Sequence, residues 1–322
     1  MKTHALAMNS KRTGGFSLLE LLVSMSVLIL ILGLLDQMFS GTAMLINYHD
    51  KTMDVDAQAR MLLDRMGIDF STMVKRTDVN YYLKSDTAES TNPQNYNLTS
   101  ANPMTAGSGL PGNDQIAFYS SVAGYYSSTT TSDESTLSLV GYRLNTTTYQ
   151  MQRFGRGLFW NGAPGTTSSG SSASGDQPAF LPVTFGATGQ WPAAISATTT
   201  DADYETLAPG VFRFEYYYLL KSGVLSTIPW DVAAGHTSLN GLQDIAAIGV
   251  TIAAIDSKSR LIVSNSTLAN LALQMRDYNA TTMTTPGAME TQWRAVLQGT
   301  SVPASARPSL HIYHRFFLLN SH

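Results

Sequence analysis

The chain has 322 residues, of which 43% are hydrophobic and only 13% are charged, about half of the usual charged fraction. It contains no cysteine, which excludes a disulfide scaffold, a zinc ribbon and a thiol nucleophile. The formal net charge is −3, and this balance argues against a nucleic-acid partner bound through a basic face. Abundant Ser, Thr, Gly and Asn are typical of an exported, β-rich protein with long polar loops.

The N-terminal region contains a segment long and apolar enough to cross a membrane. Residues 1–15 carry three basic residues and no acidic ones, and Phe16–Leu35 then contains a single charge, Glu20. Twenty helical residues rise about 30 Å, which is the thickness of the hydrocarbon core of a bilayer. Because positive charges precede the span and Asp36 follows it, the N-terminus is expected in the cytoplasm.

The small residues Gly14 and Gly15 precede the apolar run, whereas the cleavage site of an ordinary secretory signal follows it. Cleavage after Gly15 would remove the basic leader and leave the helix in place. A carboxylate such as Glu20 costs about 2.5–3.5 kcal/mol in hydrocarbon, so it needs a partner. The new α-amine of Phe16 could supply one, within the same helix or from a neighbouring subunit. The alternative is a plain signal anchor with an incidental Glu near the membrane interface.

The run Gly15-Phe16-Ser17-Leu18-Leu19-Glu20 resembles the class III signal of type IV pilins and type II secretion pseudopilins. The resemblance implies that a prepilin peptidase cuts after Gly15 and methylates the new N-terminal Phe16. It also implies that Glu20 guides the docking of subunits, an assembly role and not a catalytic one. The K type of minor pseudopilin usually lacks this Glu, so Glu20 argues against that type.

Helical periodicity continues beyond the membrane segment. Charged pairs at i,i+4 spacing, Arg60–Asp64 and Arg65–Asp69, are expected on the solvent side of this segment. The apolar positions that keep the 3.6-residue period are Ala59, Leu62, Leu63, Met66, Phe70 and Met73.

The two halves predict one helix from about Phe16 to about Val74. Residues 16–35 would form its transmembrane half and residues 36–76 its amphipathic half. A break near Gly41 remains an alternative.

Residues 77–322 are expected to form a β-rich head with loop-rich insertions at 85–113 and 161–208, where Pro, Gly and Ser are frequent. Thr136–Leu144 and Tyr149–Phe154 flank a short polar turn and predict a β-hairpin. Further strands are predicted at 115–122, 211–220, 244–255 and 310–319, and short helices at 267–275 and 289–297.

The predicted fold class is therefore α+β: a long N-terminal hydrophobic helix packed on an antiparallel sheet, with extra short helices and long loops. This order resembles the pilin-like architecture of the J-type minor pseudopilin. The segments concerned are Tyr142-Arg143-Leu144 with Arg153, and Tyr216–Leu220 with Trp230. The large prepilin-like proteins of Verrucomicrobia called cassette protein C are more similar still, through Leu63-Asp64-Arg65-Met66 and the His311–Phe317 ending.

Candidate ligand and binding residues in the head are few. Asp201, Asp203 and Glu205 alternate in a polar stretch and could bind calcium, although a solvated acidic patch is the simpler interpretation. The aromatic residues Phe212, Phe214 and Tyr216–Tyr218 could bind a glycan or a partner strand, but strand spacing favours a place in the core. Ser and Thr are abundant without a recognisable catalytic triad, and no cofactor is predicted.

The sequence therefore predicts a minor pilin or pseudopilin of a type II secretion-like or type IV pilus-like filament. Its expected partners are prepilin peptidase, the inner membrane, other pilin-like subunits and a secreted cargo. The chain would cross the inner membrane once, with its head in the periplasm. The alternatives are an adhesive or glycan-binding tip subunit of a type IV pilus and, less favoured, a membrane-anchored periplasmic enzyme.

Overall fold

The computed structural model describes residues 17–75, 81–83, 95–97, 114–124, 134–145, 148–159, 177–178, 204–237, 240, 242–299, 302–303 and 306–319. The chain divides into two compact units, residues 1–50 and 51–322. Helix α1 (Leu18–Ser71) begins in the first unit and ends in the second.

In the first unit the described residues after Ser17 are helical throughout. The alternative of a break near Gly41 is wrong, and the prediction of one long helix is confirmed. The helix ends at Ser71, three residues before the predicted end at Val74. Leu and Met, which dominate the segment, are strong helix formers.

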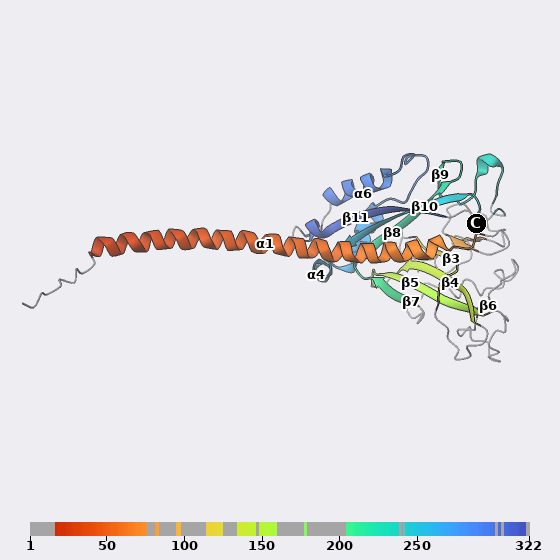
Figure 1. Cartoon of the computed structure of the whole chain (residues 1–322). Coiled ribbons are helices and arrows are strands. Elements are labelled where there is room, and N and C mark those ends of the chain that lie inside the picture. The colour runs from red at the N-terminus through yellow and green to blue at the C-terminus, as the bar shows by residue number, and fades with distance from the viewer. Residues whose placement is uncertain are drawn as a thin grey trace, which may run out of the picture. The chain divides into compact units, whose positions relative to one another are not determined.

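The second unit contains two β-sheets, drawn in Figure 1 together with the helices. The larger sheet has the order β2-β1-β3-β4-β5-β6, with β7 also paired to β5. All its pairings are antiparallel except β1 with β2 and β5 with β6. Its strands are β1 (Tyr81–Leu83), β2 (Asn95–Asn97), β3 (Ile116–Ser120), β4 (Glu134–Leu144), β5 (Met151–Phe159), β6 (Gln177–Pro178) and β7 (Tyr204–Ala208).

The smaller sheet is antiparallel throughout and has the order β11-β10-β8-β9. Its strands are β8 (Val211–Leu220), β9 (Leu225–Ser226), β10 (Ile245–Ile255) and β11 (Leu310–Leu318). The helices of this region are α4 (Ser257–Ile262), α5 (Asn265–Gln274) and α6 (Ala288–Gln298), with short 3-10 turns at η2 (Val232–Ala234) and η4 (Arg307–Ser309).

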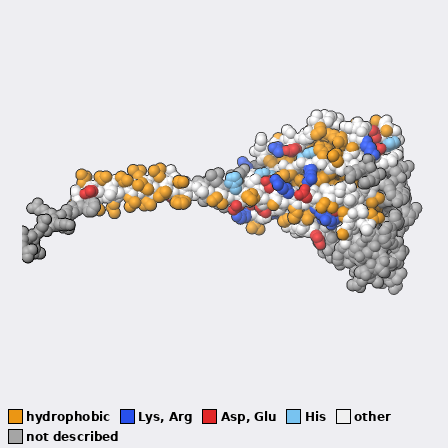
Figure 2. Space-filling view, viewed as in Figure 1, with side chains coloured by type: hydrophobic (Ala, Val, Ile, Leu, Met, Phe, Trp, Pro, Cys, Tyr) orange, Lys and Arg blue, Asp and Glu red, His pale blue; other side chains and the backbone are white. Residues whose placement is uncertain are grey.

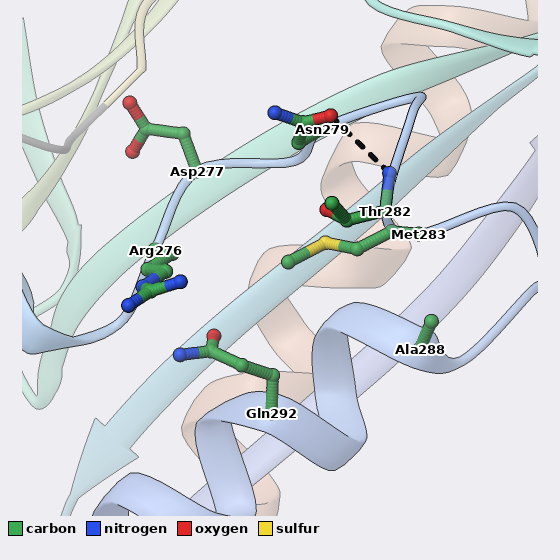
Figure 3. A pocket seen from close by; sticks show the side chains of 7 residues that line it. All are labelled: Arg276, Asp277, Asn279, Thr282, Met283, Ala288 and Gln292. Atoms are coloured by element: carbon green, nitrogen blue, oxygen red, sulfur yellow. Dashed lines mark hydrogen bonds between the residues drawn. The ribbon is translucent and has the colours of Figure 1, made fainter.

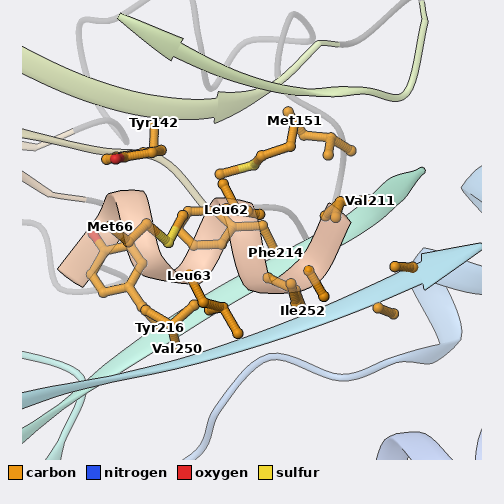
Figure 4. Close-up of a cluster of buried hydrophobic side chains, with 14 of the residues drawn as sticks. Leu62, Leu63, Met66, Tyr142, Met151, Val211, Phe214, Tyr216, Val250 and Ile252 are labelled. Atoms are coloured by element: carbon orange, nitrogen blue, oxygen red, sulfur yellow. The ribbon is translucent and has the colours of Figure 1, made fainter. Parts of the chain in front are cut away.

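The second half of α1 lies between the two sheets and forms the centre of the core (Figure 4). The ring of Phe70, on this half of α1, contacts two other rings. Its centroid lies 5.2 Å from that of Phe118 on β3 and 5.3 Å from that of Phe317 on β11. One helix therefore provides apolar contacts to both sheets. The buried apolar residues of this half of α1, each at most 8% exposed, form its apolar stripe: Val55, Ala59, Leu62, Leu63, Met66, Phe70 and Met73.

The structure confirms the predicted α+β class, in which an apolar N-terminal helix accompanies antiparallel sheets. The predicted hairpin is β4 and β5, paired in register from Leu144 with Met151. The aromatic residues of β8 are all buried, at most 6% exposed, so they belong to the core and offer no surface to a glycan. The two predicted head helices are α5 and α6, and Trp293 on α6 is fully buried.

Some short elements lie where the sequence predicts loops. Strand β2 falls inside 85–113, and both β6 and β7 fall inside 161–208. Strand β7 lacks an apolar alternation of its own and is stabilised by pairing with β5, where the rings of Tyr204 and Phe154 lie 5.2 Å apart. Such tertiary pairing overrides the local pattern.

Candidate assembly surface

The first turn of α1 carries Glu20, the carboxylate singled out by the sequence. Ser17 precedes the helix and caps it, because its Oγ accepts a hydrogen bond from the N–H of Leu19 at 3.3 Å and its carbonyl accepts one from Leu21 at 3.1 Å. Glu20 is exposed and lies where the helix dipole favours a negative charge. Gly15 and Phe16 lie outside the described residues, so cleavage between them stays a prediction.

Behind Glu20, the segment Leu18–Phe39 is long and apolar enough to cross a membrane, and none of its side chains is buried within the chain. Its large hydrophobic side chains range from 43% exposed at Leu35 to 87% exposed at Leu18. Figure 2 shows hydrophobic side chains along this whole part of the helix. The surface is an apolar cylinder with one acidic residue near its start.

The two serine hydroxyls within this segment are satisfied internally. Ser24 Oγ donates to the carbonyl of Leu21 at 3.0 Å, and Ser26 Oγ donates to that of Val23 at 2.7 Å. An α-helix also satisfies its own backbone groups, which is the condition for a stable helix in lipid. Apart from Glu20 near its start and Asp36 near its end, the segment therefore needs an apolar environment on all sides.

A buried ionic cluster fastens the second half of α1 to the larger sheet. Asp69 is fully buried, and its carboxylate accepts hydrogen bonds from Arg153 at 2.7 and 3.0 Å and from the hydroxyl of Tyr142. Arg65 adds an ion pair at 3.3 Å. The predicted Arg65–Asp69 pair thus forms, but its placement on the solvent side is wrong for Asp69.

The cluster perturbs the protonation of its members. Burial, reinforced by the negative charge of Asp69, raises the pKa of Tyr142 well above its ordinary value. Burial alone would lower the pKa of Arg153, but its hydrogen bonds and charge interaction with Asp69 outweigh this effect and raise it. Tyr142 therefore stays a neutral donor and Arg153 a permanent cation at physiological pH.

The burial of Asp69 could have been recognised from the sequence. This residue lies seven positions after Leu62 and three after Met66, which places it on the apolar stripe. An acidic residue on that stripe needs a buried cation. By contrast, Asp64 accepts a hydrogen bond from Arg315 of β11 at 2.6 Å, where both side chains are largely exposed.

A second buried ionic cluster fixes the segment between α5 and α6. Arg213 of β8 is fully buried and donates to Glu215 at 3.0 Å, to Asp277 at 2.6 Å and to the carbonyl of Met275 at 3.2 Å. Its Cζ atom lies over the ring of Trp293 on α6, 5.0 Å from the ring centroid. No local pattern indicates this cluster, since Arg213 lies within an aromatic strand.

The same segment borders a hollow of about 430 Å³ (Figure 3). Its walls come from the 276–283 segment and from α6, and Asn279 is folded back to accept from the N–H of Thr282 at 3.3 Å. The lining side chains are Arg276, Asp277, Asn279, Thr282, Met283, Ala288 and Gln292. The lining therefore combines one cation and one carboxylate with amide, hydroxyl and apolar groups.

The calcium candidates are only partly described. Glu205 lies on β7, exposed and opposite Arg153 in the strand register, while Asp201 and Asp203 lie outside the described residues. Within the described ranges, no group of three or more His, Asp or Glu side chains could hold a metal ion.

No protein-family model and no curated protein match the chain. Among solved structures, the chain is similar to one in the crystal structure of the GspK-GspI-GspJ complex from the type 2 secretion system of enterotoxigenic Escherichia coli. The identity is 11%, the alignment covers 63% of this chain and 89% of that chain, and the TM-score is 0.30.

Proposed function

We propose that this chain is a non-enzymatic structural subunit of a membrane-anchored filament, a minor pseudopilin or pilin. The observation that carries the proposal is the apolar segment Leu18–Phe39, none of whose side chains is buried within the described chain, with Glu20 in its first turn. Such a surface requires lipid before assembly and the helices of neighbouring subunits after it.

The proposed maturation begins with cleavage after Gly15 by a prepilin peptidase and methylation of the new amine on Phe16. In a filament, Glu20 of one subunit would then pair with that amine on the next. The two opposite charges would then be paired instead of each facing hydrocarbon alone. This pairing offsets the cost of placing a carboxylate at membrane depth. A subunit lacking this pairing would leave Glu20 exposed to hydrocarbon.

The proposed topology places residues 1–15 in the cytoplasm and the head in the periplasm, with a single crossing of the inner membrane. The head would then present its surface to other filament subunits or to a secreted cargo. Whether the filament belongs to a secretion system or to a pilus depends on those partners.

Intact-mass analysis of the protein from cells with an active prepilin peptidase tests the maturation step. The expected product begins with N-methyl-Phe at residue 16. A mature protein that still begins at Met1 under those conditions would overturn the assignment.

Assembly is tested with two matched variants. Glu20→Gln should insert into the membrane normally but fail to co-purify with sheared filaments. Asp36→Asn, which removes an exposed acid at the other end of the apolar segment, should assemble like the parent. Equal incorporation of both variants would refute the docking role of Glu20.

A further inference from the structure

The chain contains four Asn-x-Thr sequences in which x is not proline. In exported proteins this pattern is the acceptor sequence for a glycan on the Asn amide nitrogen, and it is expected on a surface loop. The structure places the four Asn residues in different surroundings, so it can distinguish between them as acceptors. They are Asn97, Asn145, Asn265 and Asn279.

Three of these residues lie where a modifying enzyme has poor access. Asn97 is part of strand β2, and Asn265 is the first residue of helix α5, where its Oδ1 accepts from Arg260. Asn145 is only 6% exposed, and its Oδ1 accepts from the N–H of Thr148 at 2.9 Å. A strand, a helix or burial therefore holds each of these three, whereas the acceptor pattern requires a loop.

Asn279 lies in the loop that joins α5 to α6, and it is exposed together with the three residues that follow it. The buried side chains of Tyr278 and Met283 flank this exposed stretch and fix it to the head. The ring of Tyr278 stacks on that of Tyr217 with centroids 4.3 Å apart, and its N–H donates to Glu215 at 3.1 Å. The folded chain thus presents the acceptor at its surface.

Hydrogen bonds orient the side-chain amide of Asn279. Its Oδ1 accepts from the N–H of Thr281 at 2.8 Å and from that of Thr282 at 3.3 Å, and Thr281 is the Thr of the acceptor sequence. The carbonyl is therefore turned toward the backbone of the loop, and the amide nitrogen points the other way (Figure 3). Asn279 also lines the hollow of about 430 Å³, so there is open space beside this side chain.

The chemistry of attachment suits this arrangement. Nδ2 of Asn279 forms a bond to C1 of a sugar carried on a lipid diphosphate; the C1–O bond breaks, the diphosphate leaves with the electron pair, and Nδ2 releases a proton. The hydrogen bonds to Oδ1 favour this step, because they stabilise the negative charge that loss of the proton places on the amide. Asp277, two residues earlier and 41% exposed, offers a carboxylate to a cation of the modifying enzyme.

We propose that Asn279 is an N-glycosylation site, which receives an oligosaccharide from a lipid diphosphate donor on the periplasmic side of the inner membrane. This inference rests on the topology proposed above, which places the head on that side. A glycan is bulky and hydrated, so it would keep this loop out of tight contacts between subunits. The loop between α5 and α6 therefore faces solvent in the assembled filament.

Glycopeptide mass spectrometry of the full-length chain from its own cells tests the proposal. Trypsin cleaves after Arg276 and Arg294 and releases residues 277–294, in which Asn279 is the only Asn. This peptide should carry the added mass of sugar residues, and fragmentation should place it on Asn279. The peptide of residues 261–276, which contains the Asn265 acceptor sequence, is the internal control and should be unmodified.

Matched variants test the acceptor sequence. Thr281 is exposed, so Thr281→Ala should abolish the modification without changing the urea midpoint, whereas Thr281→Ser should retain it. An unmodified 277–294 peptide in the parent chain would overturn the proposal. Sugar mass that persists on this peptide in Asn279→Gln would also overturn it, since the glycan would then be attached to a threonine hydroxyl.

Thiol labelling separates this failure from a failure of the proposed topology. The chain has no cysteine, so Val224→Cys, at a position 54% exposed in the head, provides a single reactive thiol. If a membrane-impermeant maleimide labels it in spheroplasts and Asn279 is unmodified, only the glycosylation site is wrong. If labelling requires disruption of the inner membrane, the periplasmic placement of the head is itself wrong.

Discussion

In its first half α1 exposes every side chain that the structure describes, whereas in its second half it buries Val55, Ala59, Leu62 and Met66 completely. The first half is apolar on all sides, while the second is apolar along one stripe. A stripe can be covered by two sheets of the same chain, but a fully apolar cylinder cannot be covered from one side. The second half of α1 therefore stabilises this molecule, whereas the first half requires other molecules to cover it.

The largest effect is expected from breaking the ionic cluster that attaches the second half of α1 to the larger sheet. Asp69→Ala removes the partner of Arg153 and Tyr142 and leaves a buried cation unpaired, so we expect a loss of about 3–5 kcal/mol in the free energy of unfolding. Urea unfolding of the detergent-solubilised chain, followed by tryptophan fluorescence, measures it. The control Asp64→Ala removes a largely exposed pair and should cost about 0–1 kcal/mol. Equal losses for both variants would contradict the buried role of Asp69.

The second prediction compares one leucine from each half of α1. Leu62 is fully buried, so Leu62→Ala should lower the free energy of unfolding of the head by about 2–5 kcal/mol. Leu28 is 54% exposed, and Leu28→Ala should change it by less than about 0.5 kcal/mol. The same urea titration serves for both. A comparable loss in Leu28→Ala would mean that the first half also stabilises the head.

A third, smaller effect concerns the cap of α4. Asp256→Ala should cost about 1 kcal/mol, because the N–H groups of Lys258 and Ser259 lose their acceptor. Burial raises the pKa of Asp256, but its hydrogen bonds with Ser259 outweigh this effect and lower it. The ionised carboxylate therefore stabilises the fold above its unfolded pKa of about 3.9, and this contribution disappears as the pH falls through the folded pKa.

The measurement is the unfolding free energy between pH 6 and pH 3. Asp256→Ala should show a shallower decline than the parent chain. Asp50→Asn, which alters an exposed acid of α1, serves as the comparison. If Asp256→Ala declines as steeply as the parent, the carboxylate does not contribute the expected acid sensitivity.

The elements that the sequence predicts are those with a long local pattern. The 3.6-residue stripe around Leu62 and Met66 identified α1, and the alternation on both sides of Asn145 identified the β4–β5 hairpin. Strand β7 and helix α4 were missed because one depends on pairing with β5 and the other on an Asp256 cap across only six residues. Neither carries enough pattern of its own.

The candidate assembly residues differ from the buried clusters in the same respect. Glu20 could be recognised because a single charge in an apolar run is evident from the sequence alone, without knowledge of the fold. Arg213 could not, since its partner Asp277 lies 64 residues away and only the fold brings them within 2.6 Å. Asp69 stands between these cases: its place on the apolar stripe was a sign of burial, but its spacing from Arg65 led to the wrong prediction of a solvent-side pair, and no pattern indicated Arg153 as its partner.

The smallest expected effect concerns His314, on the β11 strand that contacts α1 through Phe317. Its Nε2 lies 2.9 Å from the hydroxyl of Tyr217, and the two rings are stacked. Burial lowers the pKa of His314, and the negative charge of Glu290 partly opposes this. As the pH falls through about 6.5, the unfolded chain takes up a proton that the folded chain resists, so stability decreases.

His314→Phe should therefore flatten the pH dependence of the urea midpoint between pH 7 and pH 5. Tyr217→Phe should keep the slope, because burial of the imidazole and not its hydrogen bond is the main cause. Glu290→Gln should steepen it, because the charge that favours the imidazolium is gone. A steeper slope in Tyr217→Phe than in Glu290→Gln would show instead that the Tyr217 hydroxyl controls protonation, and that the aromatic stack between β8 and β11 is held by hydrogen bonding more than by packing.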